Sequence, residues 1–306
     1  MSTQNALVET LFSGDFEFVD LGQPLNEETL IIQLPPPFSN TPGFSQERIS
    51  KYDDAGPGWY WNVFTCGEHV GTHFDAPVHW VTGQEGCTVD DIPASDLIGE
   101  AVVLDLTAES QENPDRLLEV SDILEFEKEH GRIPPRSWFV LKTGWGRFAQ
   151  DPEKFFNADA DGMPHTPGPS TEAVEFLVKE RDVLGFACET VGTDAGIAAT
   201  FEPQFPCHNI MHGNGKFGLT QLNNLDKLPA RGAVIIASPL KITGGSGSPV
   251  RPIAIVPKQV GTTRIPPGCL NRYALPGMPV LHIHQSGGEH EQQNSTQVRT
   301  FHAQDH

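Results

Sequence analysis

Three histidines and one aspartate lie within eleven consecutive residues of this 306-residue chain. The segment reads HVGTHFDAPVH, and its candidate ligands are His69, His73, Asp75 and His79. Imidazole and carboxylate ligands without thiolates are typical of Zn²⁺, Mn²⁺ or Fe²⁺ sites, and an incomplete set of protein ligands leaves coordination positions for water. The spacing therefore predicts a catalytic metal site rather than a set of ordinary loop histidines.

The residues between these groups predict a strand followed by a turn. Gly71 and Pro77 disfavour a continuous helix, because glycine is a poor helix former and proline removes a backbone hydrogen bond. In an extended segment alternate side chains share a face, so His73 and Asp75 should point into one cavity. A bend at Gly71 would bring His69 to the same ion, and Pro77 would turn the following histidine back toward it.

The composition of the whole chain limits the classes of function. With 38% hydrophobic residues the chain can bury a sizeable core, and we expect one large domain. Its formal net charge of −20 argues against nucleic-acid binding, which needs cationic residues to neutralise phosphates. Five cysteines without a C-x-x-C pair predict a reducing, cytoplasmic setting, and we expect neither a signal peptide nor a membrane span.

Strand-like and helix-like segments alternate along the chain, which predicts an α/β fold. β-branched and aromatic residues cluster between turn signals in the expected strands, and the expected helices begin at serine with apolar residues at helical spacing. Residues 35–61, rich in proline, glycine and aromatics, are expected to form a long functional loop. The expected strands are residues 17–25, 60–66, 101–107, 137–145, 183–189, 233–242 and 251–257, and the expected helices are residues 121–131 and 170–181.

Aromatic residues precede and interleave the histidine segment, and some of them could form an apolar slot for a planar ring. We expect Phe38, Trp59 and Trp80 to contact the substrate, since they flank the ligands in surroundings rich in glycine and proline. By strand alternation Phe74 faces away from the ligands on either side of it, and we assign it to the core.

We divide the chain into residues 1–265, the catalytic domain, and residues 266–306, a polar C-terminal extension that is either disordered or packed on a neighbouring subunit. This extension is rich in histidine. A second metal site there is the alternative to a solvated tail, although the ligand spacing is irregular. The histidines concerned are His282, His284, His290, His302 and His306.

The run from His69 to His79 resembles the HxGTHxDxPxH signature of the metal-dependent "cyclase" family, which includes isatin hydrolases and bacterial kynurenine formamidases. Three further segments resemble the same family: ETVGTDAG at 189–196, FPCHNIMHGNGKFGLTQLNNLDKLP at 205–229 and PLKITGGSGSPVRPIAIV at 239–256. The resemblance implies a single compact α/β domain of the swivelling β/β/α type, with a central barrel-like mixed sheet flanked by helices. It also implies a homodimer or homotetramer with pockets near the subunit boundaries.

The same resemblance implies roles for individual residues. His69, His73 and Asp75 would hold the first metal ion, and His79 would bind a second ion or act as an acid/base. Gln221 falls where the formamidases carry a glutamate, whereas isatin-hydrolase-like members can carry a glutamine. A neutral amide can offer its oxygen to a cation but cannot take a proton as a carboxylate can. We therefore expect one Mn²⁺ or Zn²⁺ held by His69, His73, Asp75 and Gln221, with a second ion as the alternative.

Proton transfer is assigned to histidines outside that ligand set. His208 matches a later histidine of the family, and we expect His79 and His208 to be free to move protons. His212 is an alternative to His208, because an interval of four residues places both side chains on one face of a helix.

These assignments predict a metal-dependent hydrolase. A divalent ion makes hydroxide available near neutral pH and polarises a carbonyl, and a histidine then delivers a proton to the leaving atom. We expect the substrate to be a small cyclic aromatic amide such as isatin, with an aryl formamide such as N-formylkynurenine or a lactone as the alternatives.

Two interpretations from other classes use the same residues. His73, Asp75 and His208 match the two-histidine, one-carboxylate triad of non-haem Fe(II) oxygenases, but that triad leaves His69 without a role. A purely structural metal site would favour four protein ligands with cysteine among them. Dependence on O₂ would identify the oxygenase, and unfolding on metal removal would identify the structural site.

Overall fold

Four parallel strands form the centre of a nine-stranded mixed sheet in the computed structural model of the protein, which describes residues 3–34 and 36–258. Antiparallel strands extend the sheet on both sides, in the order β1-β13-β11-β5-β7-β9-β10-β4-β12. The central strands are β5 (Ile98–Asp105), β7 (Trp138–Lys142), β9 (Gly185–Cys188) and β10 (Phe217–Thr220). The flanking strands are β1 (Phe16–Asp20), β13 (Ile253–Pro257) and β11 (Ala233–Ile236) on one side, and β4 (His73–Asp75) and β12 (Gly247–Pro249) on the other.

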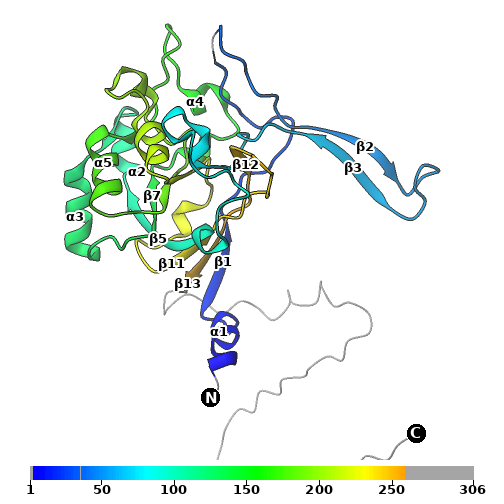
Figure 1. Ribbon diagram of the computed structural model, residues 1–306, viewed down its shortest axis with the longest axis horizontal. Coiled ribbons are helices and arrows are strands. Elements are labelled where there is room, and N and C mark those ends of the chain that lie inside the picture. Colours follow the sequence, from blue (N-terminus) through cyan, green and yellow to red (C-terminus); the bar gives the residue numbers. More distant parts are fainter. Residues whose placement is uncertain (1–2, 35, 259–306) are drawn as a thin grey trace, which may run out of the picture. The chain divides into compact units, whose positions relative to one another are not determined.

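The central strands are buried on both faces, as parallel sheets usually are. In β5, Val102 and Leu104 pack in one hydrophobic cluster, while Ala101 and Val103 pack in another. Helices α3 (Val120–His130) and α5 (Thr171–Lys179) cover the first of these faces (Figure 1). The side chain of Ser170 accepts a hydrogen bond from the backbone of the α5 first turn, which explains why that helix begins where a serine start was predicted.

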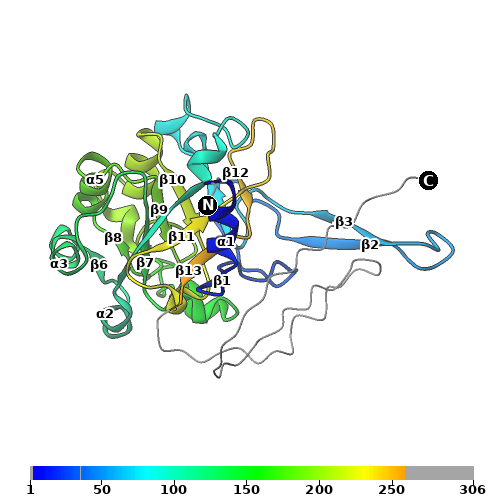
Figure 2. The same ribbon diagram turned by 90° about the horizontal axis from the view of Figure 1, so that it is seen from below.

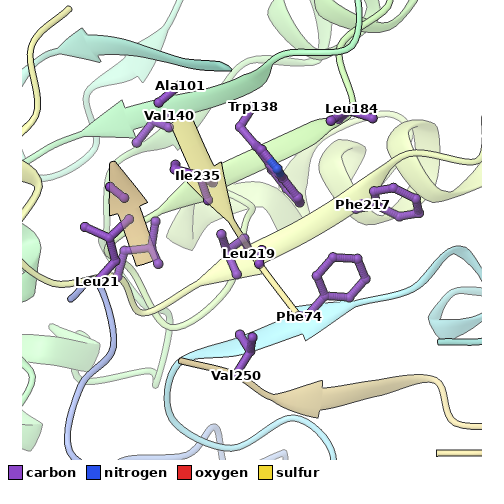
Figure 3. Packing of buried hydrophobic residues seen from close by; sticks show 14 of the residues in the cluster. Leu21, Phe74, Ala101, Trp138, Val140, Leu184, Phe217, Leu219, Ile235 and Val250 are labelled. Carbon is purple, nitrogen blue, oxygen red and sulfur yellow. The ribbon is translucent and has the colours of Figure 1, made fainter. Parts of the chain in front are cut away.

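The opposite face carries the larger core. Phe74, Trp138, Leu219 and Ile235 come from four different strands and are fully buried together (Figure 3). The assignment of Phe74 to the core is confirmed. Because β4 is packed into this core through Phe74, the two polar residues that flank Phe74 in the strand are held in fixed positions.

The expected strands and helices are all found, although several boundaries differ. The expected strand at 233–242 ends at Ile236, and the strand predicted to carry His73 and Asp75 is found as β4. The strands β10 and β12 fall in segments for which no strand range was given. The predicted fold class is confirmed, since the mixed sheet is curled into a half-barrel with helices on its outer face. The predicted domain boundary at residue 265 and the C-terminal histidines lie outside the described residues.

The expectation of a long loop over residues 35–61 is wrong in part. Residues Ser45–Lys51 form β2, which pairs with β3 (Tyr60–Thr65) in an antiparallel hairpin that extends away from the nine-stranded sheet (Figure 2). The sequence SQERISK lacks the alternation of apolar and polar residues that marks a half-buried strand, because nearly all of β2 is exposed.

The remaining elements are short. No helix in the described part of the chain is long and apolar enough to cross a membrane. The other α-helices are α1 (Thr3–Leu11), α2 (Thr107–Glu112) and α4 (Pro152–Phe156), and β6 (Leu117–Leu118) pairs with β8 (Gly168–Pro169). Single helical turns are η1 (Pro77–His79), η2 (Val81–Gly83), η3 (Ala94–Leu97), η4 (Trp145–Phe148), η5 (Gly196–Thr200) and η7 (Leu225–Lys227), and η6 (Cys207–His212) is a π-helix.

Candidate metal centre

Strand β4 carries the centre of the candidate site. His73 and Asp75 are 6% and 1% exposed, and Nε2 of His73 lies 3.3 Å from Oδ1 of Asp75. Gly71 precedes the strand with a φ angle of 63°, a conformation that glycine adopts without strain. Its carbonyl oxygen lies 2.7 Å from Nδ1 of His73, so that nitrogen donates to Gly71 and Nε2 is left to face the carboxylate.

Two further histidines of the motif approach the same carboxylate from the segments that flank β4. His69 places Nδ1 2.8 Å from Oδ1 of Asp75 and Nε2 2.9 Å from the hydroxyl of Ser246. Pro77 begins the turn η1, and this turn stacks the ring of His79 on that of His69 with 3.8 Å between ring centroids. The bend and the turn expected from the sequence are therefore present.

The π-helix η6 brings two distant histidines to the same place. Nitrogen atoms of His208 and His212 and an oxygen of Asp75 all lie within 4.8 Å of one another. Nδ1 of His208 lies 2.5 Å from Oδ2 of Asp194, a carboxylate that also accepts the backbone N–H groups of Cys207 and His208. Nδ1 of His212 donates to the carbonyl of Lys216 at 3.0 Å. Each ring thus has one nitrogen engaged outward and one left toward Asp75.

The donors of this cluster fit a divalent cation. Among the described residues, two buried polar atoms of the cluster have no hydrogen-bond partner, Oδ2 of Asp75 and Nε2 of His212. Buried polar atoms are normally satisfied, and an unsatisfied carboxylate oxygen beside imidazole nitrogens is a suitable place for a metal ion. His69, Asp75 and His79 form a second group whose ligand atoms lie within 4.8 Å of one another.

The ionisable groups of the cluster have shifted pKa values. Burial acts to raise the pKa of Asp75, but His73 and the hydrogen bonds from His69 and His73 hold it well below its usual range. Burial lowers the pKa of His79 to about 3 and that of His212 to about 4. Asp75 is therefore ionised and both of these histidines are neutral near pH 7, which leaves their nitrogens free of protons and able to bind a metal cation.

His208 is in a different electrostatic setting. Burial acts to lower its pKa, but the hydrogen bond and the negative charge of Asp194 outweigh burial and raise it above its ordinary value. The ring of Trp80 packs against that of His208 with 4.8 Å between centroids. Within one cluster the chain therefore holds an imidazole biased toward the protonated form and two biased toward the neutral form.

The predicted fourth ligand, Gln221, lies beside the cluster. It is 4% exposed and directly follows Thr220, whose hydroxyl is 3.1 Å from Nδ1 of His73. The side-chain nitrogen of Gln221 faces the carbonyl of Leu30 at 3.5 Å, and its backbone carbonyl accepts the hydroxyl of Thr72 at 2.7 Å.

Of the three aromatic residues predicted to contact the substrate, the structure places one beside the histidine cluster and leaves two exposed. Trp80 adjoins His208, as a pocket residue should. Trp59 is 49% exposed next to the start of β3, and Phe38 is 63% exposed. Among the described residues, no aromatic contact links either of them to the histidine cluster. A cavity of about 630 Å³ lies beside the cluster, with Glu68 and Thr72 in its wall, but none of the clustered histidines lines it.

Sequence reasoning missed three residues that support the histidines: Asp194, Ser246 and Glu68. Asp194 lies in the segment TDAG and Ser246 in the glycine-rich turn GGSGSP, both within segments that resemble the cyclase family. Nothing in the local pattern pairs them with particular histidines, since Asp194 and Ser246 act on rings 14 and 177 residues away.

The curled mixed sheet and this cluster define an α/β protein built to hold a divalent ion. The family model described as "Putative cyclase" matches residues 19–195, which is more than half of the chain. An isatin hydrolase of Roseibium aggregatum is 47% identical over 265 residues, which cover 84% of this chain and 100% of that protein.

The chain is also similar to a second isatin hydrolase, of known structure, and to a more distant kynurenine formamidase. The crystal structure of an isatin hydrolase bound to the product analogue thioisatinate superposes with a TM-score of 0.81 at 46% identity, covering 84% of this chain and 100% of the other. A kynurenine formamidase of Bacillus thuringiensis is 25% identical over 241 residues, covering 78% of this chain and 96% of that protein. The chain belongs to the cyclase family, and the predicted family resemblance is confirmed.

The neutral histidines make the metal-free protein sensitive to acid. The folded-state pKa values of His79 and His212, about 3 and about 4, lie below the ordinary value of 6.5. The unfolded chain therefore binds protons that the folded chain excludes, and stability is lost as the pH falls from 6.5 toward 4. We expect His212→Gln to flatten this decline by up to about 1.4 kcal/mol per pH unit, measured by denaturant unfolding in the presence of a chelator.

The half-buried His165 supplies the control. Hydrogen bonds to Asp115 and Asp159 raise its pKa, so its contribution has the opposite sign and is lost as the pH rises. His165→Gln should therefore not flatten the acid decline. An unfolding profile of His212→Gln as steep as that of the parent protein would contradict a neutral, buried His212.

Proposed function

We propose that this protein is a metal-dependent hydrolase that opens a cyclic aromatic amide of the isatin type by adding water to its carbonyl group. The observation that carries the proposal is the convergence of imidazole nitrogens on the buried Asp75 carboxylate, in a chain 47% identical to an isatin hydrolase along that protein's full length. The thioisatinate-bound relative supports a small, planar substrate.

His69, His73 and Asp75 are the proposed ligands of the ion, with Gln221 as the fourth through its side-chain oxygen. When bound, a Mn²⁺ or Zn²⁺ ion lowers the pKa of water to near neutrality and polarises the substrate carbonyl. A second ion at Asp75, His208 and His212 is the alternative arrangement, since these three residues form a group of their own.

The other histidines divide the proton transfers between them. His79 and His212 are neutral near pH 7, so either can accept the proton of the attacking water. His208, whose pKa Asp194 raises, is suited to give a proton to the leaving nitrogen as the ring opens. Trp80 packs on His208 and supplies an apolar wall for the substrate ring at that point.

The alternatives differ in the bond that breaks. An aryl formamide or a lactone needs the same attack on a carbonyl, and the 25% identical kynurenine formamidase supports the first of these. A glutamine rather than a glutamate at position 221 favours the cyclic amide. A non-haem Fe(II) oxygenase would need O₂ and would leave several of the clustered imidazoles without a role.

Turnover with and without metal tests the function. We expect purified protein to open isatin under anaerobic conditions, to lose this activity after chelation and to regain it when Mn²⁺ or Zn²⁺ is restored, measured by the change in ultraviolet absorbance. Deformylation of N-formylkynurenine without isatin opening would move the protein to the formamidase branch. Turnover that stops when O₂ is removed would overturn the hydrolase.

Paired variants separate ligands from proton carriers. His73→Ala should remove both the ion and the activity, whereas His208→Ala should keep the ion and slow turnover by on the order of 10² to 10⁴ fold. Metal content by mass spectrometry and turnover are measured on the same samples, with His165→Gln, at a histidine outside the cluster, as the control. A full metal complement in His73→Ala would refute the ligand assignment, and unchanged turnover in His208→Ala would move its role to His79 or His212.

We also propose that the enzyme is a homodimer in which the β2–β3 hairpin lies against a second copy of the chain. The hairpin exposes Trp59, Tyr60, Trp61, Val63 and Phe64, each between 47% and 58% exposed. Exposed apolar side chains gathered on one hairpin are typical of surface that a partner covers. Such an arrangement would bring Trp59 to the pocket of the other subunit and give it the role predicted from the sequence.

The four described cysteines are free thiols, which supports the proposal of a reducing, cytoplasmic setting.

Light scattering after size exclusion tests this assembly. We expect the parent protein to have twice the mass of its 33.4 kDa chain, and Trp61→Asp to dissociate it because a charge would be buried at the contact. Leu124→Asp, on the exposed face of α3, is the matched control and should leave the mass unchanged. A parent protein with the mass of one chain would exclude the dimer.

A further inference from the structure

His69 is the proposed ligand with the least support from its own segment. Its side chain is 20% exposed, compared with 8% for His73, and it lies in the irregular stretch between β3 and β4. His73 is fixed by the strand that carries it and by the nearby Gly71 carbonyl. The orientation of His69 must instead come from a distant group that the fold brings to it and from the carboxylate directly before it in the chain.

Those groups are a hydroxyl and a carboxylate. Oγ of Ser246 lies 2.9 Å from Nε2 of His69 and donates its hydrogen to Oε2 of Glu68 at 2.6 Å. The backbone N–H of Ser246 donates to the same Glu68 oxygen at 3.1 Å. A carboxylate is an acceptor only, so the single hydroxyl hydrogen of Ser246 is committed to Glu68. Ser246 must then accept from His69, which places the ring proton on Nε2.

This choice of tautomer has a direct consequence at the site. With Nε2 donating to Ser246, the ring of His69 directs Nδ1 to Oδ1 of Asp75 at 2.8 Å. These two electron-rich atoms repel each other at that distance unless a proton or a metal ion lies between them. The contacts of Ser246 and Glu68 therefore prepare His69 as a metal ligand.

The backbone around Ser246 is fixed by the strand that bears the carboxylate. Gly247 pairs with Asp75 across β12 and β4, and the carbonyl of Ser246 accepts the N–H of Ala76 at 2.9 Å. A Cβ atom at Gly247 would lie 2.4 Å from Cε1 of His69, so this turn passes directly over the ring. The serine hydroxyl is thus positioned by the same sheet register that positions Asp75.

We propose that Ser246 and Glu68 are positioning residues for the metal site, which fix the tautomer and orientation of His69 so that Nδ1 meets the ion. The inference rests on the proposed function in one respect, that the cluster binds a divalent ion. Outer partners of this kind usually change metal affinity by about 10- to 100-fold when they are removed.

Metal affinity measured by competition with a chelator tests the proposal without an assay of turnover. We expect Ser246→Ala to bind Zn²⁺ about 10- to 100-fold more weakly than the parent, and Ser246→Thr, which keeps the hydroxyl, to restore most of the affinity. Glu68→Ala should also weaken binding, because the hydroxyl hydrogen then becomes free to turn toward His69. Ser248→Ala is the matched control: Ser248 is buried two residues further along β12, and its hydroxyl bonds Leu240 and Pro249 rather than the site.

Nitrogen-15 NMR of the histidine rings adds a readout that a general loss of stability would not produce. In the Zn²⁺ form we expect one ring with Nε2 protonated and Nδ1 bound, and we expect this pattern to be lost in Ser246→Ala. Unchanged affinity in Ser246→Ala, or an equal loss in Ser248→Ala, would overturn the inference. A protein that binds Zn²⁺ in this way but leaves isatin intact would overturn the proposed function alone.

Discussion

Burial of the Asp75 carboxylate is the constraint on which the site depends. The side chain is 1% exposed, and Oδ2 has no hydrogen-bond partner among the described residues. Removing an ion from water costs on the order of several kcal/mol, so the fold must surround this carboxylate with groups that compensate the charge. It does so by placing β4 between β10 and β12, and by packing Phe74 into the core so that its neighbours cannot turn away.

Contacts on the side of each ring away from that carboxylate orient the imidazoles around it. Gly71 and Lys216 offer backbone carbonyls to His73 and His212, Asp194 offers a carboxylate to His208, and Ser246 offers a hydroxyl to His69. Each contact occupies one ring nitrogen and leaves the other for the interior of the site. The outer partner also influences the protonation of each ring. Among these four outer partners, only that of His208 is a carboxylate. Among the histidines of the cluster for which a pKa shift is resolved, only the pKa of His208 is raised.

Two of the three aromatic residues predicted to contact the substrate, Phe38 and Trp59, are exposed rather than packed against the histidine cluster. The proposed ligands and proton carriers lie on and around β4, next to the edge strand of the nine-stranded sheet, where close packing resists small displacements. Of the aromatic residues considered for substrate contact, only Trp80 lies beside that edge, whereas Trp59 lies on an exposed hairpin. An isatin-type substrate would therefore bind against a rigid polar surface. The rest of its binding site would depend on whether a second copy of the chain covers the hairpin.

The sequence alone determined the local part of this arrangement. Strand alternation, the bend at Gly71 and the turn at Pro77 act over a few residues, so the meeting of His69, His73, Asp75 and His79 could be predicted, as could the α/β class and both long helices. Only the tertiary structure decided which nitrogen of each ring faces the site. The partners that decide it come from as far as 177 residues away, and the exposed β2–β3 hairpin gave no periodic signal that Trp59 would lie apart. The orientation of the His69 ring depends on a contact between distant segments, which local pattern does not encode. The position of Trp59 depends on a hairpin whose exposed first strand has no buried face to leave a pattern.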